Sequence, residues 1–160
     1  MSEEQSGSLN IRLPGPIFLQ PGLVESFLIV ATDYLAALDV IAASKAPVYL
    51  AANSLGAQSL ECMLKAVLAR AGYTKIALGA RGVSHNLVEL WQKAAKHLRL
   101  DPDPPGWVIV LHQGHGGPPY HFRYHEEIHG LSAIPAQQLC GELAAIRKSV
   151  DMYLASATQA

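Results

Sequence analysis

Histidine side chains are concentrated in one stretch of the sequence. Five of the seven histidines fall within an 18-residue segment, and their spacing would suit metal chemistry. Imidazoles four residues apart on a helix can both reach one metal ion. Two spacings occur, a three-residue step and a ladder of four-residue steps: His112 and His115, then His121, His125 and His129.

Residues 125–129 read His-Glu-Glu-Ile-His, which satisfies the HExxH pattern of zinc proteases. In such enzymes the pattern lies within a long helix and a third ligand follows it. Here Gly130 and then Pro135 limit any helix, and no downstream Glu has an obvious third-ligand position. We therefore favour solvent-exposed loop histidines over a metal site, and a metal site over a protease.

Length and composition indicate one globular domain. A chain of 160 residues can bury a hydrophobic core without metal or disulfide cross-links. Half of the residues are hydrophobic and 16% are charged, which is typical of folded rather than disordered chains. The formal net charge of -1 gives no overall attraction to nucleic acid, so RNA binding would need a local basic patch.

The ends and the apolar runs favour a cytoplasmic protein. The polar N-terminus argues against a secretory signal. The most apolar run, residues 23–43, is interrupted by Glu25, Asp33 and Asp39, which argues against a membrane span. Cys62 and Cys140 are expected to be thiols inside helices, with a disulfide between them as the alternative.

Apolar periodicity predicts an all-α fold, an up-and-down bundle of four to five helices. We expect a loose tail over residues 1–16 and one helical domain over residues 17–157. Loops are expected at 72–84 and 114–134, and the short connection at 45–46 favours an antiparallel hairpin. Helices are expected near residues 22–44, 47–71, 86–100, 104–113 and 135–156. The WVIVL run within 104–113 could form a strand, but a lone strand would lack a partner.

The segment 47–71 is the expected centre of the bundle. Its side chains are apolar around most of the helix circumference, which is typical of a helix buried on several sides. A narrow polar stripe remains at helical spacing, formed by Ser54, Gln58, Glu61 and Lys65. Glu61 and Lys65 are four residues apart, so they can form an ion pair on the helix surface. Their functional alternative is to flank a cleft with His85.

Three parts of the chain resemble the HEPN family of helical domains. The helix SLECMLKAVLARAG (59–72) is similar to a family motif that includes Glu61 and Lys65, and SHNLVEL (84–90) is similar to the turn that supplies His85. An Arg and a His also precede the last helix. The resemblance covers residues 23–156. It implies a bundle, often a homodimer, in bacterial defence or toxin–antitoxin systems.

The resemblance also implies a site for RNA cleavage. RNase members of the family carry an Arg, four to six residues, and then a His at a dimer cleft, and this motif falls on Arg123 and His129. Arg suits phosphate, His serves as general acid or base, and the RNA 2′-OH is the nucleophile, so no cofactor or metal is expected. Tyr124 stands where the commonest form has a polar residue, and Leu131 stands where it has an aromatic one. The binding residues would be Glu61, Lys65, His85, Tyr124 and His125.

Alternatives from other classes remain open. A non-catalytic HEPN relative could bind RNA, a nucleotide or a partner such as an antitoxin protein. A bundle without catalysis could serve only for protein interaction or dimerisation, and a His-rich metal-binding protein is a third alternative. We expect a homodimer with no membrane association.

Overall fold

The computed structural model describes residues 21–117, 122, 130 and 132–156. Within these ranges the chain forms helices and no strands, which confirms the all-α prediction. The predicted tail, residues 1–16, lies outside the described part of the chain. The helices in order are α1 (Leu23–Ser44), α2 (Tyr49–Arg70), α3 (Lys75–Gly79), α4 (Leu87–Leu98), α5 (Gly106–His115) and α6 (Ala136–Ser156).

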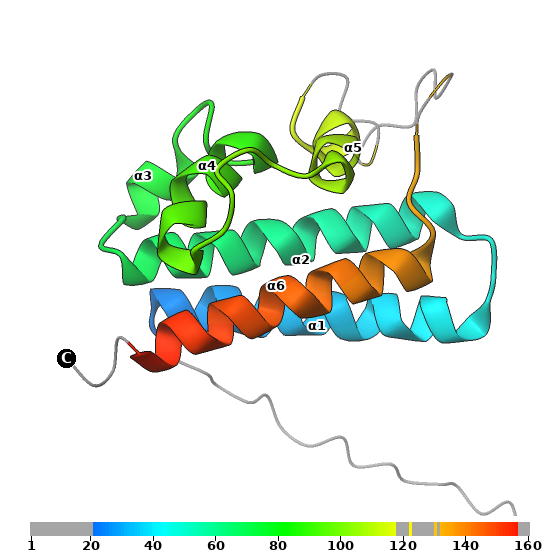
Figure 1. Cartoon of the computed structure of the whole chain (residues 1–160), viewed down its shortest axis with the longest axis horizontal. Helices are drawn as coiled ribbons and strands as arrows, with labels where there is room; N and C mark the ends of the chain where they lie inside the picture. Colours follow the sequence, from blue (N-terminus) through cyan, green and yellow to red (C-terminus); the bar gives the residue numbers. More distant parts are fainter. Residues whose placement is uncertain (1–20, 118–121, 123–129, 131, 157–160) are drawn as a thin grey trace, which may run out of the picture.

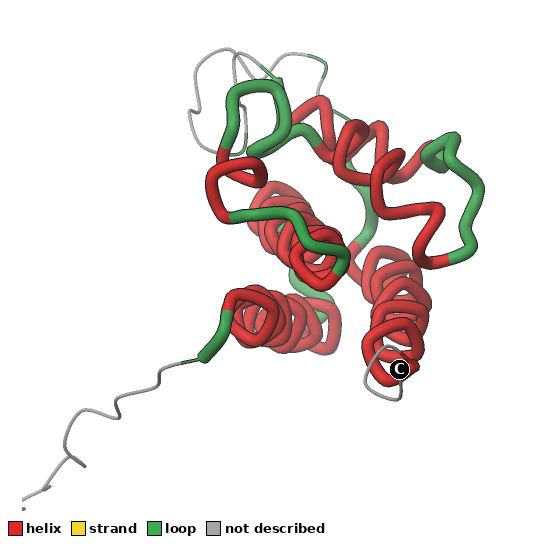
Figure 2. The backbone as a smooth tube through the Cα atoms, turned by 90° about the vertical axis from the view of Figure 1, so that its left-hand side faces the viewer, coloured by secondary structure: helices red, strands yellow, loops and turns green. Residues whose placement is uncertain are grey.

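Three long helices pack against one another, and the shorter helices lie across α2. Figure 1 shows α1 and α2 as an antiparallel hairpin, as predicted, with α6 beside both and running in the same direction as α2. Figure 2 looks along these three helices and shows the shorter ones on the far side of α2 from α1. The up-and-down order therefore ends after the hairpin, because the segment from α3 to α5 crosses α2 before the chain returns as α6.

Helix α2 is the centre of the core. Every side chain from Ser59 to Leu68 is buried, and α2 packs against each of the other five helices. The apolar pattern in the sequence predicted this position. The contact with α6 is especially close at Gly56, since a Cβ atom there would overlap the side chain of Leu139.

Helix α1 covers α2 with one side and leaves the other side apolar and exposed. Ala31 and Leu38 are fully buried, whereas Ile29, Val30 and Val40 are exposed, Val40 to 70%. In length and composition α1 could also cross a membrane: an 18-residue window has a mean hydropathy of 1.7, and 11% of it is buried. Within the structure α1 packs along α2 and α6.

Side-chain amide and hydroxyl groups fix the long helices to their neighbours. Asn53 on α2 donates to the carbonyl of Ile134 over 2.8 Å and accepts from its N–H over 2.9 Å, which holds the chain ahead of α6 against α2. Ser59 donates to the Ala31 carbonyl of α1 over 2.8 Å. All three hydrogen bonds are buried. Each one therefore satisfies polar atoms whose burial without a partner would destabilise the fold.

Helix boundaries match the sequence predictions to within about two residues, with three corrections. Helix α5 continues to His115, so the predicted loop 114–134 begins too early. The predicted loop 72–84 contains the one-turn helix α3, because the Thr74 side chain accepts from the N–H of Ala77 and caps it. Helix α2 begins at Tyr49, so Pro47 precedes the helix instead of occupying its first turn. The Asn86 side chain caps α4, since it accepts from the Glu89 N–H over 3.0 Å. Cys62 and Cys140 are free thiols, as expected.

Candidate functional site: a buried carboxylate on α2

A buried carboxylate on α2, that of Glu61, contacts three basic side chains. One oxygen, Oε1, accepts from the Lys65 ammonium over 2.6 Å. The other oxygen, Oε2, lies 3.0 Å from Nδ1 of His85 and 2.5 Å from Nε2 of His115. The Glu61 side chain is 6% exposed, His115 is fully buried, and the His85 side chain is 38% exposed. The group therefore opens to the surface at His85.

Three separate elements bring these side chains together. Glu61 and Lys65 are one turn apart on α2, so their pairing is local. His85 stands in the turn between α3 and α4, where Ser84 bonds back to the Ala80 carbonyl and Asn86 caps α4. His115 is the last residue of α5. Packing of α4 and α5 on α2 thus places both imidazoles over one carboxylate oxygen.

Close packing at the end of α5 fixes the position of His115. The neighbouring Gly114 has no side chain, and a Cβ atom there would overlap the ring of Phe122. Phe122 is buried and donates its N–H to the Gly114 carbonyl over 3.0 Å. The imidazoles of His85 and His115 meet edge to face, with ring centroids 5.8 Å apart. The rings therefore have little freedom to turn away from Glu61.

Glu61 is held in its ionised form. Burial by itself would raise the pKa of this carboxyl, but the hydrogen bonds from His115, Lys65 and His85 act in the opposite direction and lower it to about 2. Since the carboxylate can only accept, each imidazole nitrogen that faces Oε2 carries a proton in this arrangement. The nearby Cys62 thiol has its pKa raised to about 12 by burial and by the Glu61 charge, so it is an unreactive thiol.

The donor set at this point has two kinds of chemistry available. A carboxylate that orients an imidazole through one ring nitrogen is the pairing that general acid–base catalysis uses. Two imidazoles and one carboxylate are also a common set of ligands for a divalent transition metal. Ligand atoms of Glu61, His85 and His115 all lie within 4.8 Å of one another.

The structure brings together three of the residues that the sequence singled out, namely Glu61, Lys65 and His85. Ser54 and Gln58, the other two members of the predicted polar stripe, are half-buried and make none of the contacts to Glu61. Four predicted site residues lie outside the described part of the chain, as does His121: Arg123, Tyr124, His125 and His129.

His115 was missed as a partner of Glu61. The sequence shows it only as part of a His-x-x-His spacing with His112, and a separation of 54 positions in the sequence hides its contact with Glu61. His112 does not join the carboxylate: its Nδ1 is buried without a hydrogen-bond partner in the described residues. Burial lowers the pKa of His112, and the nearby His115 lowers it further.

Basic side chains are concentrated next to His85. Residues 70–99 hold six of the twelve Lys and Arg residues and a single Glu. Lys75, Arg81, Lys96 and Arg99 are exposed, whereas Lys93 pairs with Glu89 over 2.9 Å. This stretch, which we name the basic segment, begins at the end of α2 and includes α3 and α4 (Figure 1).

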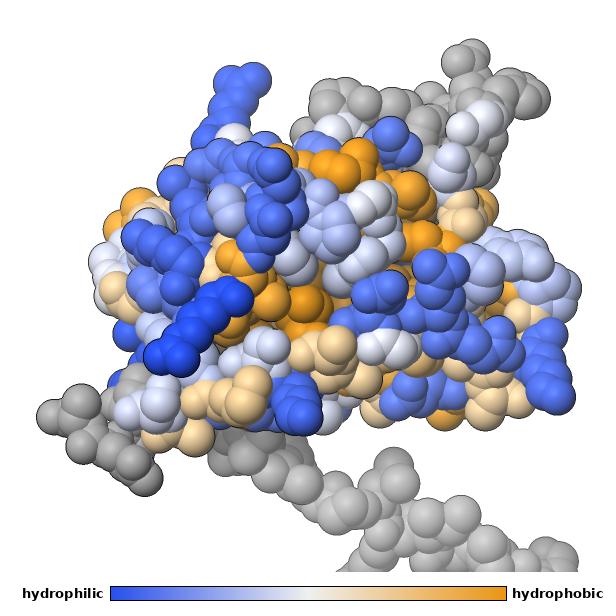
Figure 3. All heavy atoms as spheres, in the orientation of Figure 1, coloured by the Kyte–Doolittle hydropathy of each residue, from blue (hydrophilic) through white to orange (hydrophobic). Residues whose placement is uncertain are grey.

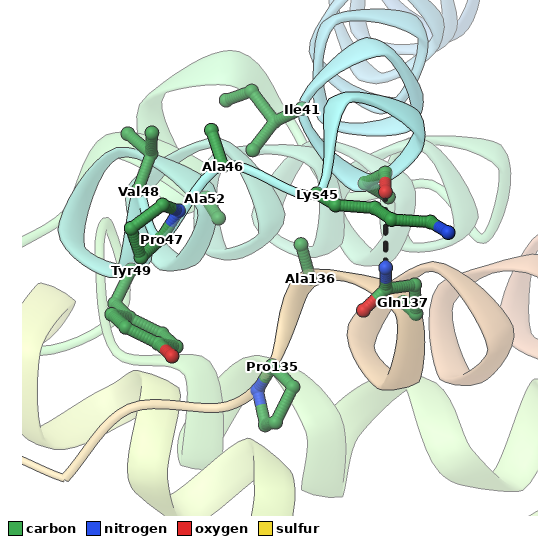
Figure 4. Close-up of a pocket in the computed structure, with 11 residues that line it drawn as sticks. Ile41, Lys45, Ala46, Pro47, Val48, Tyr49, Ala52, Pro135, Ala136 and Gln137 are labelled. Carbon is green, nitrogen blue, oxygen red and sulfur yellow. Dashed lines mark hydrogen bonds between the residues drawn. The ribbon is translucent and has the colours of Figure 1, made fainter.

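A hollow with different chemistry lies where the α1–α2 connection meets the start of α6. Figure 4 shows Pro47, Pro135 and Ala136 around it, and the Gln137 side chain donating to the Ala42 carbonyl over 3.1 Å. Its volume is about 300 Å³. Its lining is mainly aliphatic and backbone, and among the residues that the structure describes it includes two titratable side chains, Lys45 and Tyr49. The hollow and the cluster of ionisable side chains around Glu61 therefore lie at different places. We place the candidate site at Glu61 because its side chains can do chemistry.

The face drawn in Figure 3 carries hydrophobic atoms along the line where the shorter helices meet the long ones, bordered by hydrophilic residues. Between α4 and α6 the surface is lined by His97, Arg99, Met152 and Tyr153. None of these contacts Glu61, so this face is separate from the candidate site.

Comparison of the chain with family models, with curated proteins and with solved structures found no significant match.

Proposed function

We propose that the chain is a HEPN-type helical domain that binds RNA and cleaves it without a metal, as a cytoplasmic homodimer in a defence or toxin–antitoxin system. The observation that carries RNA binding is the basic segment. A chain of net charge -1 needs a local concentration of cations to attract a polyanion. Residues 70–99 provide one, with one acidic residue that is already paired and five exposed cations, namely Arg70, Lys75, Arg81, Lys96 and Arg99.

The buried network supports the same proposal from inside the fold. Glu61, Lys65 and His85 are among the motif residues on which the resemblance rests, and Lys65 and His85 each contact Glu61 directly. In this proposal Glu61 holds the turn that carries His85 and so positions the cations on either side of it. Arg123 binds the phosphate and His129 transfers the proton. Phe122, which precedes Arg123 in the sequence, packs on Gly114 beside His115.

The test is binding and cleavage of a single-stranded RNA by the purified chain. We expect salt-dependent binding by fluorescence anisotropy, and cleavage that persists in the presence of a chelator. Binding without cleavage would leave the RNA-binding part of the proposal and remove the catalytic part. Absence of both at low salt would remove the RNA function.

A second candidate, a dimerisation or protein-interaction bundle without catalysis, is favoured by the exposed side of α1. Ile29, Val30 and Val40 present apolar surface there, and a hollow beside Ile29 is bordered by Glu25, Asp33 and Arg147. A two-fold interface pairs the same patch on both subunits, and a patch with an apolar centre and charges of both signs suits such self-pairing. A second copy of the chain is the partner that we propose.

A further inference from the structure

The geometry points to a divalent transition-metal site, with Zn²⁺ as its representative ion, formed by Oε2 of Glu61, Nδ1 of His85 and Nε2 of His115. It is separate from the HExxH-like run at 125–129, because its ligands come from α2, from the turn ahead of α4 and from the end of α5. It does not depend on the proposed RNA function.

Oε2 of Glu61 lies closer to the two imidazole nitrogens than ligand atoms lie to one another in a metal-bound set. Oε2 lies 3.0 Å from Nδ1 of His85 and 2.5 Å from Nε2 of His115. Ligand atoms in a tetrahedral Zn²⁺ site are about 3.3 Å apart, because each lies about 2.0–2.2 Å from the metal. A shift of the carboxylate by less than about 1 Å would make room for the ion. Both imidazoles already present the required nitrogen to the carboxylate, and Zn²⁺ would displace the protons on these two nitrogens, which are released to solvent.

The surroundings also fit an open metal site. Lys65 binds Oε1 over 2.6 Å and leaves Oε2 directed at the two imidazoles, and such hydrogen bonds to a ligating carboxylate are a regular feature of metal sites. Three protein ligands leave a fourth position open, and the 38% exposure of the His85 side chain gives access to it. The Lys65 charge adds to that of the metal, which favours an anionic ligand at the open position. Two nitrogen ligands select Zn²⁺ or a similar ion over Mg²⁺.

The test uses the full chain without a histidine tag, freed of metal with a chelator and titrated calorimetrically with Zn²⁺ alone. We expect one ion per chain, a higher Tm with Zn²⁺ because three elements become joined, and no such response to Mg²⁺. His85→Ala and Glu61→Gln should each weaken Zn²⁺ affinity at least about tenfold. The matched control is His97→Ala on α4, a half-buried histidine that contacts Tyr153 and lies outside the set.

His85→Ala is the preferred variant, because His85 is the most exposed of the three ligands. Circular dichroism establishes whether this variant is folded. If Glu61→Gln does not fold, His85→Ala and the visible spectrum of the Co²⁺-loaded wild type decide, since tetrahedral nitrogen and oxygen ligation gives intense bands. Absence of saturable Zn²⁺ binding would overturn the proposal. So would wild-type affinity in His85→Ala, because the ion would then be held by other histidines. RNA binding has its own assay, so each proposal can fail alone.

Discussion

The carboxylate of Glu61 and the imidazole of His115 are 54 residues apart in the sequence and 2.5 Å apart in the structure. Both side chains are almost completely buried. Taking a charge out of water is costly unless it is paired, and Glu61 is paired on both oxygens. Helices α2 and α5 are therefore joined by a polar contact whose loss would remove one of the three partners of a buried ion.

The first prediction concerns acid stability. The pKa of Glu61 is lowered from 4.5 to about 2 in the folded chain. A lowered pKa means that the stabilisation is fully present above pH 4.5 and is lost as the pH falls towards 2. By linkage it amounts to about 3 kcal/mol. Urea unfolding measured at intervals from pH 6 to pH 2.5 should show a falling free energy of unfolding in the wild type and a flatter profile in Glu61→Gln.

At pH 7 the same substitution should destabilise the fold by about 3 kcal/mol, because it leaves the buried Lys65 ammonium without its counter-ion. The matched control is Glu89→Gln on α4, which removes a more exposed pair with Lys93 four residues away. That change should cost a few tenths of a kcal/mol. Equal effects of the two substitutions would contradict the buried-network account.

The second prediction concerns the close contact of α2 with α6. Gly56→Ala places a methyl group against Leu139. Overpacking of a rigid core costs about 1–3 kcal/mol, which thermal or urea unfolding would measure. Leu139→Ala costs stability alone by forming a cavity, but combined with Gly56→Ala it should cost less than the sum of the two changes.

Gly79→Ala is the matched control for helix glycines, because no atom lies within 4 Å of a Cβ there and its backbone angle is unstrained. It should leave stability unchanged or raise it by up to about 1 kcal/mol, since alanine restricts the unfolded chain. A cost at Gly79 as large as that at Gly56 would mean that the contact with Leu139 does not set the effect at Gly56.

Most of the fold could be predicted because it is governed by local periodicity. On α4, for example, the apolar side chains that recur at three- and four-residue steps are all buried: Leu87, Leu90, Trp91, Ala94 and Leu98. The Asn86 cap is equally local. The crossing of α2 by α4 and α5 could not be predicted, because it depends on how helix surfaces fit together. Helix α3 was missed since one turn of helix has too few residues to show a period.

The candidate site shows the same division. The pairing of Glu61 with Lys65 follows from a spacing of four residues, and the structure has it at 2.6 Å. The burial of this ion pair could not be predicted from the sequence, since an ion pair at this spacing usually lies on the surface. His115 had no sequence signal as a partner of Glu61, because that contact exists only once α5 packs on α2.

The third prediction concerns the basic segment. Arg81→Ala combined with Lys96→Ala should weaken RNA binding and should lower the slope of log affinity against log salt by about 1.4, since each contact with single-stranded RNA contributes about 0.7. Both residues are exposed, so the fold should be unaffected. Fluorescence anisotropy over a range of salt concentrations measures the slope. Lys148→Ala, an exposed lysine on α6, is the control and should leave the slope unchanged; a drop of equal size there would mean that binding is not confined to this segment.

The fourth prediction concerns the exposed side of α1. Val40→Glu places a charge in the proposed dimer interface and should convert the dimer to a monomer, as measured by light scattering with size-exclusion chromatography. Val40 is 70% exposed, so a folded monomer should tolerate the change. Met152→Glu on α6, at 58% exposure, is the control and should leave the dimer intact. A wild-type chain that is monomeric at high concentration, or that sediments with membranes, would contradict this assignment of α1.

The fifth prediction concerns the proposed RNA-cleaving pair. Arg123→Ala and His129→Ala should each abolish cleavage, because one removes the phosphate-binding cation and the other removes the acid–base group. The buried network should be unaffected, so both variants should keep the wild-type Tm and the acid profile of Glu61. His97→Ala is the matched histidine control, and it should cleave at the wild-type rate. Cleavage that survives in both Arg123→Ala and His129→Ala would mean that other residues carry out the reaction. A variant of His85 would then be the next to measure. The His85 imidazole is oriented by a carboxylate and reaches the surface beside exposed cations.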